Sequence, residues 1–261
     1  MPAVNPERLV EEVKEVQGLI GNPSRLRWRV VEILEFYSDR IKRSQATLRS
    51  GHADKKYGVP RPVLHALERG LKQSLSDHPE LSTAILEEFW GMDYRETRYL
   101  AIKLLEIQPL EDVLRVAETW SVEMKDRELL GTLAQTLVSS WRIVYFQDFS
   151  QMTSKWLHEK RTPLKSLAMA TLRSAVDDPG FSDLPYIFSL LKVQDIVRNV
   201  SLRRALIDLL RALIRRSEAE SARFLLDILD MDASTGRKLI RALLECFSPD
   251  QRLRLKRALS T

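Results

Sequence analysis

The sequence predicts an all-α protein, a single α-solenoid or superhelix of antiparallel helix pairs. Apolar residues recur at steps of three and four, as in Leu9, Val13 and Val16 and again in Leu202 and Leu206. No window alternates apolar and polar residues with a period of two, and only nine glycines are available for hairpin turns. Helix-start signals recur along the whole chain, which favours helices throughout.

Each expected helix follows a proline or a residue that caps helix N-termini. In chain order these signals are Asn22–Ser24, Pro60, Asp77–Pro79, Asp93, Pro109, Asp126, Thr162–Pro163, Ser182–Asp183, Asp232–Ser234 and Ser248–Pro249. They predict about twelve to fourteen helices, most of about 12 to 18 residues. Successive starts lie about 16 to 20 residues apart, so a helix pair takes about 35 to 40 residues, close to the HEAT or armadillo period.

This spacing predicts one HEAT-like domain over residues 1–261, in which each helix pair buries its apolar face against the next. Two segments interrupt the spacing: a long basic loop from Ser44 to Val59 and a Pro-Gly turn from Asp177 to Asp183. Neither is long enough or biased enough in composition to be a domain linker. We expect the helices to line a concave surface that suits a long, regular ligand such as a duplex.

The composition narrows the class of protein. Hydrophobic residues make up 44% and charged residues 30%, as in a soluble globular protein. The apolar runs are too short to span a bilayer, and Met1 to Pro6 do not read as a signal peptide. The single cysteine, Cys246, is expected to be a small buried hydrophobe and fits a reducing cytoplasm. Four scattered histidines and the lack of glycine-rich phosphate loops predict neither a metal nor a nucleotide cofactor.

Positive charge is concentrated in two zones. From Val197 onward the chain has 14 basic and 8 acidic residues, whereas the first 196 residues have 27 and 28. A second cluster, from Arg40 to Arg61, has seven basic residues and one acid, Asp54. Two basic zones on a balanced background favour a polyanionic partner, although solvated basic faces are also common on helical proteins.

One stretch resembles a known family. It begins YGVPRPVLHALERGLKQ at Tyr57, continues LSTAILEEFWGMD, and ends YRETRYLAIKLLEI. The order of a Gly-Val-x-x-Pro entry, a spacer helix and a Tyr-x-x-x-Arg-Tyr-x-Ala-Ile helix resembles the AlkD-like family of HEAT-repeat DNA alkylation repair proteins. Weaker similarities follow in LAQTLV at 133–138 and LLRALIRRSEAESARFLLD at 209–227.

The resemblance implies a curved stack of helix pairs that grips duplex DNA. Active members of the family excise cationic N3- or N7-alkylated purines. An aspartate and tryptophans lie against the deoxyribose of the lesion and stabilise the cationic sugar that forms as the glycosidic bond breaks. A cationic purine is already a good leaving group, so a negative charge placed near C1′ supplies most of what the reaction needs.

The catalytic residues of the family do not carry over to this sequence. Trp120 matches the first tryptophan of the signature helix, and Leu133 and Ala134 match the stretch that follows it. Arg127 stands where the second tryptophan is expected, and Gly131 stands where the catalytic aspartate is expected. Asp126 and Glu128 lie nearby, but helical geometry turns each residue by about 100° relative to the next.

The two remaining family positions also differ. In the Trp-x-x-Arg-x-Ala helix, Ala168 is retained, while Pro163 and Ser166 replace the tryptophan and the arginine. Arg161 or Lys165 could then supply the phosphate contact. In the final Trp-x-Leu-Arg group, Asp208 replaces the tryptophan, whereas the leucine at 210 and the arginine at 211 agree.

The candidate DNA-contacting residues are basic side chains from the two basic zones and from the Trp-x-x-Arg-x-Ala helix. They are Lys55, Lys56, Arg161, Lys165, Arg204, Arg211 and Arg215. Arg204, Arg211 and Arg215 are spaced to share one face of a leucine-rich helix, which is typical of a phosphate-contacting stripe. The five tryptophans, including Trp28, are all expected to pack in the core.

Three functions are consistent with these observations. The first is a duplex-DNA-binding relative of the alkylpurine glycosylases, with weak, altered or absent excision. The second is an active glycosylase whose carboxylate comes from an unmatched position such as Glu128 or Asp126. The third is a HEAT-like scaffold for an acidic protein partner. For the first we expect a cytoplasmic monomer that binds double-stranded DNA through phosphate contacts, without a membrane or metal partner.

Overall fold

The computed structural model describes residues 4–38, 55–141, 146–191 and 199–260. Within these ranges the chain forms fourteen α-helices and four short 3-10 turns, and its only β pairing is an isolated bridge between Lys55 and Tyr94. The prediction of an all-α helical repeat fold is confirmed. The expected basic loop from Ser44 to Val59 lies outside the described residues as far as residue 54.

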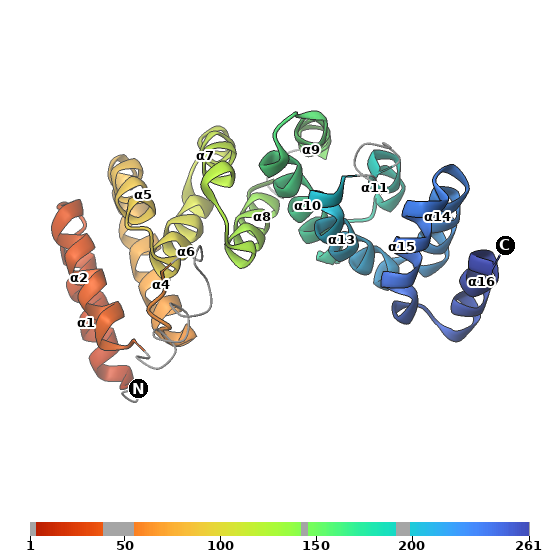
Figure 1. Cartoon of the computed structure of the whole chain (residues 1–261). Coiled ribbons are helices and arrows are strands. Elements are labelled where there is room, and N and C mark those ends of the chain that lie inside the picture. Colours follow the sequence, from red (N-terminus) through yellow and green to blue (C-terminus); the bar gives the residue numbers. More distant parts are fainter. Residues whose placement is uncertain (1–3, 39–54, 142–145, 192–198, 261) are drawn as a thin grey trace. The chain divides into compact units, whose positions relative to one another are not determined.

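The chain divides into two compact units, Met1–Ser140 and Trp141–Thr261. Each unit is a stack of helix pairs in two rows (Figure 1). That residues 1–261 form a single domain stays a prediction.

In unit 1 the helices alternate between two rows. They are α1 (Pro6–Gly18), α2 (Pro23–Phe36), α4 (Arg61–Asp77), α5 (Ser82–Gly91), α6 (Arg95–Leu104), α7 (Leu110–Glu123) and α8 (Arg127–Trp141), with 3-10 turns η1 (Pro79–Leu81) and η2 (Leu105–Ile107). Helix α4 packs against α1 and α6, and α5 packs against α2 and α6. We call α1, α4, α6 and α8 the first row of unit 1 (Figure 1).

Unit 2 continues the same alternation. Its helices are α9 (Phe146–His158), α10 (Thr162–Asp177), α11 (Leu184–Leu191), α13 (Arg203–Arg216), α14 (Glu218–Met231), α15 (Ala233–Leu243) and α16 (Pro249–Ser260), with turns η3 (Val200–Leu202) and η4 (Leu244–Cys246). Helix α13 packs between α10 and α15, and α14 packs against α13, α15 and α16. We call α10, α13 and α15 the first row of unit 2 (Figure 1).

Some of the start signals work through side-chain capping of the helix N-terminus. The side chain of Asn22 accepts a hydrogen bond from the amide of Arg25 at 3.1 Å, and that of Asp232 accepts one from the amide of Thr235 at 3.1 Å. These bonds satisfy amides that have no partner inside the helix. Other signals act without such a bond, since Pro60 and Pro109 are N-cap residues that make no side-chain hydrogen bond. Asp77–Pro79 leads into the 3-10 turn η1, and α5 begins only at Ser82.

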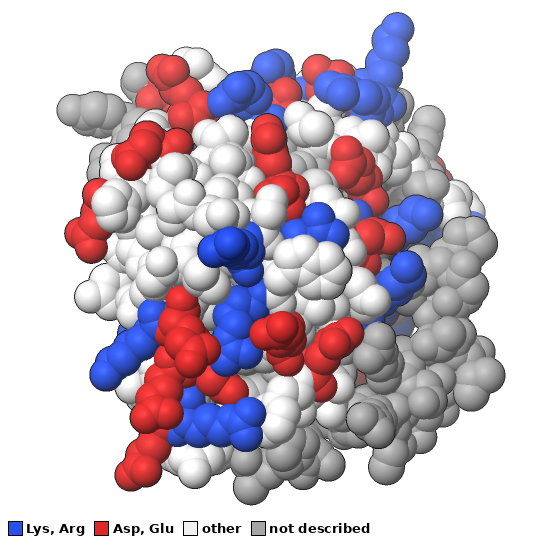
Figure 2. All heavy atoms as spheres, turned by 90° about the vertical axis from the view of Figure 1, so that its left-hand side faces the viewer, with Lys and Arg blue, Asp and Glu red and all other residues white. Residues whose placement is uncertain are grey.

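The expectation that all five tryptophans are buried is wrong for Trp28. Trp90, Trp120, Trp141 and Trp156 are buried, but Trp28 is 65% exposed. It lies on α2 in the first helix pair, on a side that no other described helix covers. Two more exposed apolar residues, Val10 and Phe36, belong to the same pair. Figure 2 views the chain from this end and shows a broad uncharged area bordered by acidic and basic side chains.

Cys246 is exposed, not buried as its apolar surroundings in the sequence predicted. It lies at the end of the 3-10 turn η4, which follows α15 directly. The tighter 3-10 geometry breaks the 3.6-residue period, so Cys246 does not continue the apolar face to which the buried Leu243 belongs.

Helices α14 and α15 approach so closely that their contact requires a glycine. A Cβ atom added at Gly236 of α15 would lie 2.4 Å from the Cα and 2.8 Å from the backbone nitrogen of Leu229 on α14. Such distances are far inside van der Waals contact, and the obstructing atoms are backbone. The close approach therefore fixes α15 firmly against α14.

We expect Gly236→Ala to lower the free energy of unfolding by about 1–3 kcal/mol, because the two helix backbones must move apart. The matched control is Gly131→Ala on α8, where an added Cβ meets nothing within 4 Å. That change should leave stability unchanged or raise it by up to about 1 kcal/mol, since alanine favours the helix. Chemical denaturation followed by circular dichroism measures both, and equal effects would contradict the close-approach interpretation.

Candidate nucleic-acid interface

The stretch that begins at Tyr57 is fastened to α6 by a buried carboxylate. Glu96, which is 6% exposed, accepts hydrogen bonds from the backbone amides of Tyr57 at 3.0 Å and Gly58 at 2.7 Å. Gly58 has φ of 73°, a left-handed conformation that glycine adopts readily. The ring of Tyr57 stacks on that of Tyr94 with centroids 4.3 Å apart. We call the segment around Tyr57 and Gly58, which leads into α4, the entry loop. The sequence resemblance in this segment therefore reflects how the entry loop is attached to α6.

This attachment places two of the predicted DNA-contacting residues. The carbonyl of Lys55 accepts a hydrogen bond from the amide of Arg95 at 2.8 Å, so the loop runs beside the N-terminus of α6. The side chain of Lys55 is exposed, with its ammonium 5.9 Å from the centroid of the Tyr94 ring, and Lys56 is half-buried. Both lysines thus lie next to the start of a helix in the first row of unit 1.

The space beside Gly131 on α8 is empty. A Cβ added there meets nothing within 4 Å, and the residue lies on the partly exposed side of the helix. Three residues earlier on the helix is Glu128, whose side chain is 79% exposed and forms an ion pair with Arg95 of α6. A Cβ at position 131 therefore meets no steric conflict, and a side chain there would leave the helix about 60° around its axis from Glu128.

The other candidate carboxylate, Asp126, is already engaged in holding α8. It accepts hydrogen bonds from the amides of Glu128 at 2.7 Å and Leu129 at 3.3 Å, and it pairs with Arg95 at 3.1 Å. These contacts cap the N-terminus of α8 and tie it to α6. Of the two acids, only Glu128 points a largely exposed carboxylate from the same side of the helix as Gly131.

Trp120 is a packing residue. Its ring stacks on that of Trp90 with centroids 4.0 Å apart and planes 1° from parallel, and both side chains are buried. The indole nitrogen of Trp90 donates a hydrogen bond to Glu123 at 2.7 Å, and the guanidinium of Arg98 lies 4.8 Å from the Trp90 ring. The stack joins α5 to α7, so Trp120 presents no open aromatic face to a ligand.

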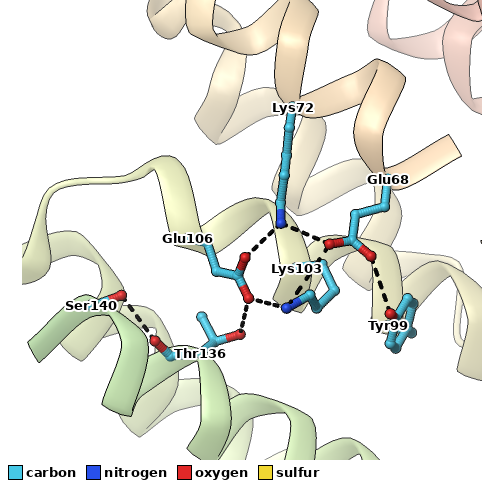
Figure 3. Close-up of polar contacts among 7 residues, drawn as sticks. All are labelled: Glu68, Lys72, Tyr99, Lys103, Glu106, Thr136 and Ser140. Carbon is cyan, nitrogen blue, oxygen red and sulfur yellow. Dashed lines mark hydrogen bonds and ion pairs between the residues drawn. The ribbon is translucent and has the colours of Figure 1, made fainter. Parts of the chain in front are cut away.

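A network of ion pairs crosses the first row of unit 1 (Figure 3). Lys72 of α4 contacts Glu68 of the same helix at 2.7 Å and Glu106 of η2 at 2.6 Å. Lys103 of α6 pairs with Glu106 and lies 3.9 Å from Glu68. The two lysines and two glutamates balance in charge, and all four side chains are mostly buried. Unit 1 thus neutralises these two lysines internally.

Two hydroxyl groups complete this network. Tyr99 of α6 donates to Glu68 at 3.1 Å, and Thr136 of α8 donates to Glu106 at 3.4 Å. Burial and the adjacent Glu68 raise the pKa of Tyr99 to about 12. Burial alone would raise the pKa of Glu106, but Lys103 and Lys72 outweigh it and lower that pKa. The network therefore links α4, α6 and α8.

In unit 2, Arg204, Arg211 and Arg215 are exposed along one face of α13, as their spacing predicts. Arg211 pairs with Asp208 of its own helix at 3.3 Å, and Arg215 pairs with Asp177 at the end of α10 at 2.7 Å. The described residues offer Arg204 no ion-pair partner. The stripe is continuous, but two of its three cations are partly compensated.

Arg216, the next residue in the sequence, stabilises the packing of α13 against α10. Its guanidinium donates to the carbonyls of Val176 at 2.7 Å, Asp178 at 2.9 Å and Phe181 at 2.8 Å. These are carbonyl groups at and beyond the C-terminus of α10, which lack partners inside that helix and attract a positive charge. Arg216 therefore fixes α10 against α13 and is not available to a ligand.

Arg161 and Lys165 lie at the N-terminus of α10. Arg161 is the exposed N-cap residue, and its carbonyl accepts a hydrogen bond from the amide of Lys165 at 3.4 Å. Lys165 is half-buried. A third cation of the same helix, the exposed Arg173, lies about 80° from Lys165 around the helix axis. Arg161 and Lys165 therefore lie one helical turn apart at the N-terminal end of α10, a first-row helix of unit 2.

Helix α15 carries basic residues that sequence reasoning missed. Arg237, Lys238 and Arg241 are exposed, opposite a buried side that includes Leu239 and Ile240. The signal was present in the segment GRKLIRAL, where cations at steps of three and four interrupt an apolar repeat.

The family model described as DNA alkylation repair enzyme matches residues 36–243, most of the chain. The chain belongs to the DNA alkylation repair enzyme family. Neither a curated protein nor a solved structure matches it. The family match extends from the end of α2 to the end of α15, and so includes both first rows apart from α1.

No helix among the described residues is long and apolar enough to cross a membrane. Within the same residues, no group of three or more His, Cys, Asp or Glu side chains is arranged to hold a metal ion.

We expect Glu106→Gln to lower the free energy of unfolding by about 1–3 kcal/mol, because Lys72 and Lys103 then lack a carboxylate in a mostly buried setting. A lowered carboxyl pKa stabilises the fold above the unfolded-state pKa, and that contribution disappears as the pH falls through the folded-state pKa. The loss caused by the substitution should therefore be full at pH 7 and shrink in acid.

Urea denaturation at several pH values measures this effect. The control is Glu128→Gln, which also breaks an ion pair but at the surface, and it should change stability by less than about 1 kcal/mol. A pH-independent loss for Glu106→Gln would contradict the role given to its charge.

Proposed function

We propose that this family member binds duplex DNA through phosphate contacts and that its base-excision activity is weak, altered or absent. Family membership supports a role related to DNA alkylation repair. The basic stripe of α13 supports contact with a polyanion, because Arg204, Arg211 and Arg215 share one exposed face of a first-row helix.

The proposal that base excision is weak, altered or absent rests on one observation, the lack of a side chain at Gly131. The resemblance puts the family's catalytic aspartate there, and Gly131 has no side chain to stabilise a cationic sugar. Trp120, the matched tryptophan, is stacked against Trp90 and buried, so it offers no surface for a deoxyribose. The chain thus retains the scaffold without the catalytic groups that the resemblance leads us to expect.

A second candidate function rests on Glu128. Its carboxylate is largely exposed on the same side of α8 as Gly131, beside Arg95. If it reaches the sugar of a damaged nucleotide, it replaces the missing aspartate and the chain is an active alkylpurine glycosylase. Asp126 does not compete for this role, because its oxygens cap α8 and pair with Arg95.

For DNA binding, we expect an undamaged duplex to bind at about 50 mM salt and to bind far more weakly at about 200 mM, because phosphate contacts release counterions. Replacing Arg204, Arg211 and Arg215 together by glutamine should raise Kd by about 10- to 100-fold and lower the salt slope by about 2 to 3. Fluorescence anisotropy with a labelled duplex measures both quantities.

The matched control replaces three exposed cations outside the first row of unit 2, namely Lys14, Arg25 and Arg223. It makes the same change in net charge and should leave the affinity nearly unchanged. No duplex binding by the unaltered protein at low salt would rule out DNA binding and favour a scaffold for an acidic protein partner.

For excision, we expect the unaltered protein to release 7-methylguanine from a duplex no faster than the spontaneous reaction. Gly131→Asp places a carboxylate in the open space on α8 and should raise the release rate by about tenfold or more. Chromatography of the freed base gives the rate. Release by the unaltered protein that Glu128→Gln abolishes would establish the second candidate function instead.

A further inference from the structure

Helix α15 is unusual in its charge. Its eleven residues, Ala233–Leu243, include Arg237, Lys238 and Arg241 and no acidic residue. The described residues offer none of these three cations an ion-pair partner. The neighbouring helix α13 differs, since Arg211 and Arg215 there are paired with aspartates. All three cations of α15 therefore lack an ion-pair partner among the described residues, whereas two of the three arginines of the α13 stripe have one.

Helices α13 and α15, each with an exposed basic face, are neighbours in the first row of unit 2. The two helices pack side by side, and α14 packs against both, so the exposed sides of both are turned away from α14. The close approach at Gly236 holds α15 against α14 and sets the direction of its exposed side. A side-chain cap from Asp232 to the amide of Thr235, at 3.1 Å, fixes where α15 begins. The three cations thus project from a rigid element.

We propose that α15 is a second phosphate-contacting helix, and that Arg237, Lys238 and Arg241 hold the sugar-phosphate backbone of the same duplex that contacts α13. This inference rests on the proposed DNA binding. Packed helices lie about 8–10 Å apart, and duplex DNA carries one charge per about 1.7 Å of its axis, so both stripes have several phosphates within reach. Cations without partners gain most from a phosphate, because no existing ion pair has to be broken.

The geometry gives α15 the larger share of the electrostatic binding. On α13, a phosphate competes with Asp208 for Arg211 and with Asp177 for Arg215. On α15 a phosphate meets no such competitor among the described residues. Removal of the α15 cations should therefore weaken binding at least as much as removal of the three α13 arginines.

The test compares three charge-matched triple variants in the full chain, using a labelled undamaged duplex at several salt concentrations. The first replaces Arg237, Lys238 and Arg241 by glutamine. The second makes the same change at the three α13 arginines, and the third at Lys14, Arg25 and Arg223. A further variant, Arg237→Lys with Arg241→Lys, keeps the charge of α15.

We expect the α15 triple to raise Kd by about 10- to 100-fold at about 100 mM salt and to lower the salt slope by about 2 to 3. The lysine variant and the control triple should bind nearly as the unaltered protein does. Circular dichroism and thermal melting check that each variant is folded. Should the α15 triple be unfolded, the single substitution Arg241→Gln at this exposed position replaces it, with about a third of the change in slope.

The outcomes separate this inference from the function on which it rests. If the α15 variant binds as tightly as the unaltered protein while the α13 variant is weakened, α15 is not a contact and DNA binding by the chain stands. If the unaltered protein does not bind the duplex at low salt, both proposals fall. Equal weakening by the control triple would show an effect of net charge alone and would overturn the assignment to α15.

Discussion

Burial of apolar helix faces is the constraint on which the rest of this structure depends. Each helix pair covers its apolar side with its neighbours, as α13 does between α10 and α15 with α14 behind it. Only one side of each first-row helix is then left for polar and charged residues. The chemistry that the molecule presents to a partner is consequently decided by a few positions per helix, spaced at three and four residues.

The two units use those positions differently. In unit 1, Lys72 and Lys103 are enclosed by two glutamates, and Arg95 is held by Asp126 and Glu128. These charges hold α4, α6 and α8 in register. In unit 2 the cations of α15 have no ion-pair partner among the described residues. Most of the charges described in unit 1 thus serve the packing of the stack, whereas those of α15 do not.

Features that depend on the local spacing of residues could be predicted from the sequence. The helix starts follow capping residues such as Asn22 and Asp232, and the α13 stripe follows from a helical period. Features that depend on tertiary contacts could not be predicted. Neither the attachment of the entry loop through Glu96 nor the capping of α10 by Arg216 has a local signature, because the partner groups lie about 40 residues away in the chain.

The solvent exposure of side chains at the end of the helix stack and at the end of a 3-10 turn could not be predicted from the sequence either. Trp28 looks like a core residue until the first helix pair is seen to lack a covering neighbour on one side among the described residues. Cys246 belongs to an apolar run, but a change from α to 3-10 geometry turns it outward. The basic face of α15 was readable but was not recognised, because its cations are interleaved with a strong apolar repeat.

The open space at Gly131 has a consequence for how such a protein changes over generations. A Cβ added at this position meets nothing within 4 Å, so the fold leaves room for a side chain there. Under the proposed function, a carboxylate can be gained or lost at position 131 over generations while the helices, caps and ion pairs of the scaffold are preserved.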